Sequence, residues 1–484
     1  MTWKPIPNNP HWEYNDAPAE PSVGSPYRAL WLRQTDGVRT ANYAGYHHSP
    51  HKVYVDTRRV GDTTDTSRGE LSKSFWDAKG DEDDIETDMI LVFRTTGANQ
   101  QVRIGAATYS FNDGGGWQLI DYDASIDWGD GTTSSVTGSP ANNAGLLHTF
   151  ASAGDHTVRV SGPGFHKVNF NPGSVGQTSG GNTEAQTDRL ISVLNLGDVG
   201  HKDLRFAFYR TRQMTNFTLG HTDLSTCRGM GDFLAQRTWN MNNNAVPLTV
   251  DLTNLDMSGF QNYPSYSQAI NFFKTSAVNM NTLNLTGINT TGVTRMDGMF
   301  RSITGSGGNT SVANALNLTT IDVRPLNTSS VYIFTSMFYE NPTVTTITGI
   351  GDMDVSSGTR FMFMFADTDL TGSLDLSSWD FSSAINYNHM FYSCNNLTDI
   401  IGIENINVTN LQNTSALSNF LYQVTLPTSR YDQLLINLAA QTKNIASQTA
   451  HFGYSKYTRG GAAEAARTSL INNDGYTITD GGGA

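Results

Sequence analysis

The sequence has few charged residues, and this shortage separates it from ordinary soluble domains. Charged side chains make up 15% of the 484 residues, against about 25% in an average soluble domain. Asn, Thr, Ser and Gly fill their place, and the net charge is −13. Hydrophobic residues still account for 38%, with 23 Phe, 19 Tyr and 8 Trp. Because disordered chains are poor in aromatic residues, we expect a folded protein with large cores.

Long apolar runs and blocks of basic residues are also missing. A helix that spans a bilayer needs about 20 consecutive apolar residues, and the densest runs, Met89–Phe93 and Ala269–Phe273, are far shorter. An acidic chain without a basic block lacks the charge that holds nucleic-acid phosphates. We therefore expect neither membrane insertion nor a nucleic-acid partner.

Cysteine is scarce, and the first residues carry no targeting pattern. Two cysteines, Cys227 and Cys394, exclude a disulfide-rich scaffold and a four-cysteine zinc site. The opening residues have no apolar stretch, so we expect no secretory signal. A composition typical of extracellular or virion proteins, without an export signal, fits a phage structural protein that is made in the host cytoplasm and released by lysis.

The most informative feature is a repeat in the second half of the chain. Leu283–Phe300, Ile321–Phe338 and Leu374–Phe391 align without gaps over eighteen positions. Apolar residues occupy positions 1, 3, 6, 11, 14, 17 and 18, with Asn or Asp at 7 and Ser or Thr at 9. The base period is 26 to 27 residues, with two polar insertions near 261–268 and 305–315. Position 17 recurs at Ala207, Phe233, Phe272, Met299, Met337, Met364, Met390 and Leu417.

This pattern predicts the structure of one repeat. Positions 1 and 3 alternate with polar residues, as in a strand with one buried face. The Asn or Asp at position 7 favours a turn, and the Ser or Thr at position 9 is a good N-cap. Apolar positions 11, 14, 17 and 18 have the spacing of one helix face. Each repeat should therefore be a strand, a turn and a short helix, stacked into a solenoid with the Met-Phe pairs as core ladders.

These repeats resemble a known family. The segment LDLSSWDFSSAINYNHMFYSCNNLTDI, with its strand, Asp-x-Ser step and Met-Phe pair, is similar to the BspA-type leucine-rich repeats of bacterial surface proteins, mycoplasma lipoproteins and some phage proteins. The resemblance covers about Leu190 to Leu421. It implies adhesion and binding, without indicating a ligand.

A second pattern lies upstream of the repeats. Ile126–Gly131 (IDWGDG) is followed by His148–Phe150 (HTF) and Gly154–Gly162 (GDHTVRVSG). Alternating strands and Gly/Asp turns are evident from the pattern alone. The order WGDG…HTF…GDHTVRV resembles PKD-type Ig-like sandwiches, modules that commonly precede BspA-type repeats.

We therefore expect a mixed, β-rich, modular chain of five parts. An N-terminal arm and small β-rich anchoring domain occupies 1–84, an Ig-like β-sandwich 85–170, a linker 171–188, an α/β leucine-rich-repeat solenoid 189–425, and an α/β cap 426–484. The Pro- and Trp-rich start suits attachment to another virion protein, through Trp3, Trp12 and Tyr14. Both ends, WKPIPNNPHWEY and the tail from 455, resemble phage structural proteins.

Possible sites for chemistry have simpler structural explanations. His47, His48 and His51 form a dense cluster, but adjacent side chains on a strand point to opposite faces, so a polar loop or interface is favoured over a metal site. Asp127, Asp130 and Asp155 carry oxygen ligands that suit calcium, whereas their neighbouring glycines are equally typical of tight turns. The acidic run 81–88 is expected to be a solvated linker.

No catalytic motif is present: the sequence contains no G-x-S-x-G elbow, H-E-x-x-H pair or P-loop. We therefore expect no enzymatic activity, cofactor or metal. The strand positions that face solvent should instead offer a polar, weakly charged ligand-binding surface for glycans or proteins. Its residues are Asn284, Thr286, Asp322, Arg324, Asp375 and Ser377.

The expected function is adhesion without catalysis, by a phage virion protein displayed on the tail or capsid. Its partners would be other virion proteins and a protein or glycan of the host surface, and we expect a homo-oligomer. Three alternatives remain: a bacterial cell-surface adhesin that lacks its signal, a capsid decoration protein with a purely structural role, and a tail-borne polysaccharide depolymerase. The sequence leaves open whether the two insertions are recognition loops.

Overall fold

The chain divides into two compact units, 1–86 and 87–484. The computed structural model describes the strands of the first 85 residues by their backbone only. Beyond them it describes 86–106, 109–112, 117–139, 144–170, 184–209, 211–227, 229–234, 248–262, 272, 280–301, 318–445 and 447–484.

The N-terminal unit contains two antiparallel sheets of three strands each among its described residues. One has the order β1 (Lys4–Ile6), β2 (Asn9–Asn15) and β3 (Trp31–Gln34). The other has the order β4 (Tyr46–Ser49), β5 (Lys52–Asp56) and β6 (Arg68–Glu70). The first twenty residues, expected as an extended arm, thus contain a hairpin in which β1 pairs with β2.

The larger unit begins with an antiparallel β region. Its strands are β7 (Met89–Thr95), β8 (Gln100–Arg103), β9 (Tyr109–Asn112), β10 (Trp117–Ile120), β11 (Tyr122–Asp127), β12 (Thr133–Gly138), β13 (Leu147–Phe150) and β14 (Gly154–Gly164), with a 3₁₀ turn η1 at Ala144–Leu146. Four of them form the order β12-β11-β14-β7, and β8 pairs with β13 while β9 pairs with β10. Burial alternates residue by residue along β11, as expected for a strand with one face on a core.

The antiparallel region and the repeats share one sheet. Strand β7 pairs with β14 on one side and with β15 (Leu190–Asn195) on the other. From β15 onward the pairing is parallel, through β16 (Asn216–Thr218) and β17 (Leu248–Asp251) to β18 (Met280–Asn284). The short helix α2 (Glu184–Thr187) precedes β15. Because the sheet is continuous, the first repeat is covered by β7 rather than left open to solvent.

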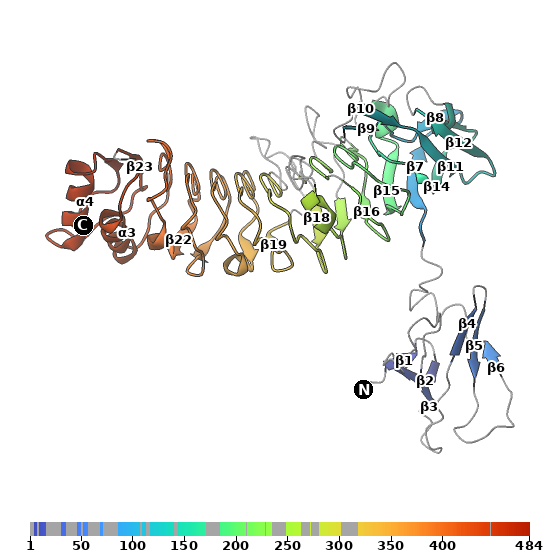
Figure 1. Ribbon diagram of the computed structural model, residues 1–484, viewed down its shortest axis with the longest axis horizontal. Coiled ribbons are helices and arrows are strands. Elements are labelled where there is room, and N and C mark those ends of the chain that lie inside the picture. Colours follow the sequence, from blue (N-terminus) through green and yellow to red (C-terminus); the bar gives the residue numbers. More distant parts are fainter. Residues whose placement is uncertain are drawn as a thin grey trace. The chain divides into compact units, whose positions relative to one another are not determined.

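The later repeats stack in the same direction. Parallel pairs join β19 (Thr320–Asp322) to β20 (Thr346–Thr348), and β21 (Gly372–Asp375) to β22 (Leu397–Ile401). Figure 1 shows these successive turns of chain side by side, with the strands along one edge. Short 3₁₀ turns lie between strands, at η2 (Ser258–Asn262), η3 (Ile350–Asp352) and η4 (Ile403–Asn405).

The Met-Phe pairs form core ladders, as the repeat predicts. The rings of Phe300, Phe338, Phe365 and Phe391 are fully buried. Neighbouring rings stack with centroids 5.6, 5.6 and 5.2 Å apart and planes within 9° of parallel. Such aromatic pairs contribute about 0.5–1.5 kcal/mol each beyond burial of area. Each repeat therefore depends on its neighbours for its core.

The short helix expected in each repeat does not form in the described residues between 283 and 421; consecutive turns take its place. Instead of bonding within the segment, alternate N–H groups donate to the next repeat. Those of Phe334, Ser336 and Phe338 donate to carbonyls of residues 360, 362 and 364 at 2.8–2.9 Å. Left-handed φ at position 16, 58° for Ser336 and 57° for Phe363, is incompatible with a continuing helix.

These inter-repeat hydrogen bonds also fix the register. Phe208, Phe300 and Phe338 each donate their N–H to the next residue of the position-17 series. The last repeat departs from the position-17 series, because the N–H of Phe391 donates to the carbonyl of Phe420 rather than to that of Leu417. The expected assignment of Leu417 to position 17 is therefore wrong by three residues, although both side chains are buried.

The C-terminal residues contain the longer helices of the described chain. Helix α3 (Thr428–Ala440) buries Tyr431, Leu434, Leu435 and Leu438. Helix α4 (Ala462–Asn472) follows, and β23 (Thr449–His451) pairs in parallel with β24 (Thr477–Thr479). Among the described residues, no helix is long and apolar enough to cross a membrane.

Candidate binding surfaces

The predicted ligand residues lie at equivalent turns that follow strands β18, β19 and β21. Asn284, Asp322 and Asp375 end these strands, and each accepts a hydrogen bond from the backbone N–H two residues later, at 3.0, 3.1 and 2.9 Å. All six predicted residues are exposed except Asp322, which is half-buried. The strand edge therefore presents one turn per repeat, closed by its own polar side chain.

The carboxylates at this edge are paired with an arginine or accept hydrogen bonds within their own turns. The Arg324 guanidinium contacts both carboxylate oxygens of Asp322 at 2.6–3.2 Å and lowers the pKa of that carboxyl. Hydrogen bonds from the Ser377 hydroxyl and backbone lower the pKa of Asp375. These turn hydrogen bonds already occupy the carboxylates that a ligand would need.

Three of the predicted residues share one small cavity. It has a volume of about 110 Å³ and lies between β18 and β19, which belong to different sheets. A space of this size holds a few water molecules. Its lining residues are Leu283, Asn284, Leu285, Thr286, Thr320, Ile321, Asp322 and Pro325.

The sequence analysis missed a second surface, a row of aromatic rings that follows positions 16 and 19 of the repeats and ends at His451 on β23. We call it the ring row: Tyr339, Phe363, His389, Tyr392, Tyr422 and His451. All six side chains are partly exposed. Successive centroids lie 5.5, 4.5, 5.3, 4.8 and 5.2 Å apart. Stacking of the repeats brings together rings that are distant in the sequence.

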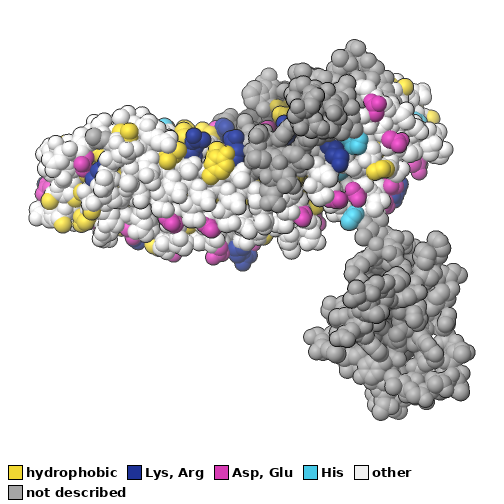
Figure 2. Space-filling view, viewed as in Figure 1, with side chains coloured by type: hydrophobic (Ala, Val, Ile, Leu, Met, Phe, Trp, Pro, Cys, Tyr) yellow, Lys and Arg dark blue, Asp and Glu magenta, His cyan; other side chains and the backbone are white. Residues whose placement is uncertain are grey.

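The ring row begins beside an arginine side chain. Figure 2 shows hydrophobic, histidine and basic side chains gathered along the upper edge over the repeats, whereas acidic side chains are more frequent along the lower edge. Its first ring, Tyr339, is covered by the Arg301 guanidinium, 4.7 Å from the ring centroid. The same guanidinium pairs with Glu340 at 3.2 Å.

Burial and neighbouring carboxylates perturb titration along this edge. Burial, followed by the charge of Glu340, raises the pKa of Tyr339 to about 12. The same two causes raise the pKa of Asp367 above its usual range. Burial lowers the pKa of His389 and of His451, which favours the neutral imidazoles. At neutral pH the row thus presents uncharged rings beside a few carboxylates.

The candidate calcium residues in the antiparallel region have protein partners. Asp127 accepts the N–H of Gly129 at 2.9 Å. Asp130 accepts the Thr132 hydroxyl at 2.6 Å and contacts His148 at 2.7 Å; the Thr132 hydrogen bond is the main reason that its pKa falls to about 2. Asp155 accepts hydrogen bonds from Nε and Nη2 of Arg94 at 2.7 and 2.8 Å. No group of three or more potential metal ligands occurs in the described part of the chain.

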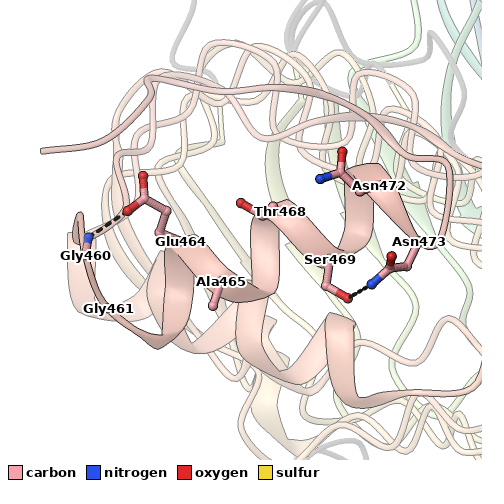
Figure 3. A pocket seen from close by; sticks show the side chains of 8 residues that line it. All are labelled: Gly460, Gly461, Glu464, Ala465, Thr468, Ser469, Asn472 and Asn473. Carbon is pink, nitrogen blue, oxygen red and sulfur yellow. Dashed lines mark hydrogen bonds between the residues drawn. The ribbon is translucent and has the colours of Figure 1, made fainter.

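A shallow pocket of about 490 Å³ lies along α4 and is lined by small polar side chains (Figure 3). Two of its polar groups bond within the helix ends: Glu464 accepts the N–H of Gly460 at 2.7 Å, and Asn473 donates to Ser469 at 3.0 Å. Both bonds are local contacts at the ends of α4. Their presence makes this pocket a weaker candidate than the ring row.

Several predicted residues lie where the structure gives no side chains. Trp12 and Tyr14 are on β2, and His47 and His48 on β4, as backbone only. Trp3, His51 and the insertion 305–315 are outside the described residues. Cys227 and Cys394 are described, and both are buried thiols that form no disulfide bond.

Comparison with known proteins gives one match. Residues 308–425 match the model of a family described as "Mycoplasma protein of unknown function, DUF285". The match overlaps the stretch predicted to contain BspA-like repeats and supports that resemblance over this part of the chain. It includes the ring row from Tyr339 to Tyr422. Neither a curated protein nor a solved structure matches the chain.

Proposed function

We propose that this chain is a non-catalytic adhesion protein of a phage virion, displayed on the tail or capsid, that binds a glycan or protein of the host surface. In this proposal residues 85–170 are a PKD-type Ig-like sandwich and 189–425 a leucine-rich-repeat solenoid with a cap at 426–484. The N-terminal region attaches the chain to other virion proteins, and the repeats face the host.

The ring row is the observation that carries this proposal. Aromatic rings and arginines are the side chains that supply most binding energy at protein interfaces, and here they gather on one edge of the repeats. The strand edge offers only small polar groups that already close turns. The ring row therefore replaces the strand edge as the preferred binding surface.

The continuous sheet determines which fragment can test the proposal. A fragment that starts at residue 185 would lose β7 and expose the edge of β15. An exposed strand edge promotes aggregation. Residues 87–484 keep β7 and form a compact unit, so this fragment is the suitable protein to compare with the full chain.

The test compares adhesion of the full chain and of 87–484 to intact host cells. We expect both to bind, and Tyr392→Ala with Tyr422→Ala to weaken the binding of both. Asp375→Ala with Ser377→Ala is the matched control on the strand edge. If neither protein adheres to host cells, adhesion is refuted in favour of a structural role. Release of reducing sugar from host capsule would instead identify a depolymerase.

A further inference from the structure

The ring row advances by one step for each repeat. Tyr392 and Tyr422 stack with centroids 4.8 Å apart and planes 9° from parallel, and Phe363 and His389 stack at 4.5 Å. The hydrogen bonds between repeats set this step, since it equals the spacing of neighbouring strands, about 4.8 Å. A ligand that lies along the row therefore meets at least one aromatic ring, at position 16 or 19, in each repeat from Tyr339 to Tyr422.

The faces of the stacked rings contact one another. In the pairs Tyr392–Tyr422 and Phe363–His389, each ring covers a face of its neighbour, and Arg301 covers Tyr339. The solvent-facing parts are accordingly ring edges and phenol hydroxyls. Within the described part of the chain, neither the Tyr392 nor the Tyr422 hydroxyl has a hydrogen-bond partner. Two hydroxyls one step apart are therefore available to a ligand.

A second line of polar side chains runs beside the rings at position 20. It consists of Glu340, Asp367, Ser393 and Gln423, which are all partly exposed. They are held in place by left-handed φ values of 53–66°, and the Ser393 hydroxyl donates to the Gln423 amide oxygen at 2.9 Å. Each of these four repeats thus places a ring edge beside a hydrogen-bonding group, which suits a sugar that carries C–H and hydroxyl groups around its ring.

The spacing favours a sugar chain over an extended peptide. A peptide strand advances about 3.3 Å per residue and presents alternate side chains to opposite faces. The spacing of its side chains on one face therefore differs from the spacing of the repeats. A pyranose unit in an extended glycan advances by about one such step. Glu340 is paired with Arg301 and the pKa of Asp367 is raised, so the row carries little net charge, which favours a neutral polymer.

We propose that the ring row binds a linear, neutral, β-linked glycan lengthwise, with one sugar unit against each of four repeats from Tyr339 to Tyr422 and one against His451 of the cap. This proposal rests on the proposed adhesion function and adds the class of ligand and its direction of binding. Four successive repeats and strand β23 of the cap contribute rings to the row, so five sugar units fill it.

The test is calorimetric titration of the full chain with β-1,4-linked glucose oligomers and β-1,4-linked N-acetylglucosamine oligomers of one to six units. We expect the affinity for at least one series to rise with every unit up to about five and then to level off. One net hydrogen bond corresponds to about a threefold to tenfold change in affinity. Polygalacturonate, an anionic polymer, should bind more weakly than the preferred series.

Phenol-to-phenyl substitutions provide the matched variants. Tyr392→Phe and Tyr422→Phe keep the stacked rings and the fold, and each should lower affinity for the five-unit oligomer about threefold to tenfold. Tyr454→Phe, at a tyrosine 59% exposed and outside the row, should leave affinity unchanged. Thermal melts of all three variants should match that of the parent chain.

The outcomes separate this inference from the proposed function. Three outcomes overturn the ring row as a glycan site. They are an affinity that does not depend on oligomer length, an affinity of Tyr392→Phe and Tyr422→Phe equal to that of the parent chain, and no binding of either oligomer series. Preference for polygalacturonate also overturns it. In each of these cases, adhesion of the intact chain to host cells would still leave the proposed function standing, with another surface or ligand.

Discussion

His201 should make the stability of the larger unit depend on pH. Its side chain is 1% exposed, and its Nε2–H donates to the Leu196 carbonyl at 3.1 Å. The other ring nitrogen, Nδ1, is buried without a hydrogen-bond partner in the described structure. Protonation at Nδ1 would bury an uncompensated charge. Burial is accordingly the main reason that the pKa of His201 falls from 6.5 to about 4.

The sign and size of the effect follow from this lowered pKa. Between pH 6.5 and pH 4 the unfolded chain binds a proton that the folded chain does not, so stability falls as the pH falls. The contribution of neutral His201 is complete above pH 6.5 and is lost progressively toward pH 4. Between pH 7.5 and pH 4.5 the loss is about 2.5 kcal/mol, from about 1.36 kcal/mol per pH unit.

Urea unfolding of residues 87–484, followed by tryptophan fluorescence at both pH values, measures this loss. His201→Gln should lose about 2.5 kcal/mol less than the parent between pH 7.5 and pH 4.5, whatever its stability at neutral pH. His221→Gln, at an exposed histidine in the same region, should behave as the parent does. An equal pH dependence of parent and His201→Gln would refute the reasoning.

Three further predictions concern other buried groups. Asp203→Asn should lower the free energy of unfolding by about 3–5 kcal/mol in urea titrations, because it breaks a buried ion pair with Lys167 at 2.9 Å. The control Asp198→Asn, at an exposed residue, should change the free energy of unfolding little, and an equal loss in both variants would contradict the prediction. Phe365→Ala should lower it by about 3–5 kcal/mol by opening the stacked ladder, and a loss below 1 kcal/mol would argue against the ladder. Burial raises the pKa of the Cys394 thiol to about 12, so Ellman's reagent at pH 8 should label it only after denaturation, and rapid labelling of the native protein would disprove its burial.

The sequence was sufficient to locate the repeat and its buried positions. The recurring Met-Phe pairs mark the core because a repeated apolar position can be buried only against its copies, and the rings of Phe338 and Phe365 do stack in the core. The expected α/β cap at 426–484 does contain helices, α3 and α4. Local periodicity was strong enough in these segments to identify them.

The same periodicity failed inside the repeats. Positions 11, 14, 17 and 18 have helical spacing, yet the segment forms turns whose N–H groups donate to the next repeat. Spacing reports which side chains are buried, but it does not report whether the backbone bonds within its own segment or to a neighbour. The error at Leu417 has a related cause, because only the hydrogen bond from Phe391 shows that Phe420 occupies the position.

The sequence by itself determined the period, the core positions and the shortage of charge, because each of these is a property of residue order and composition. Only the tertiary structure decided that β7 continues the sheet into β15 and that rings about 30 residues apart, such as Tyr392 and Tyr422, meet in one row. Both results depend on stacking, in which contacts join residues one repeat apart. A pattern within one repeat cannot show what its neighbour places beside it.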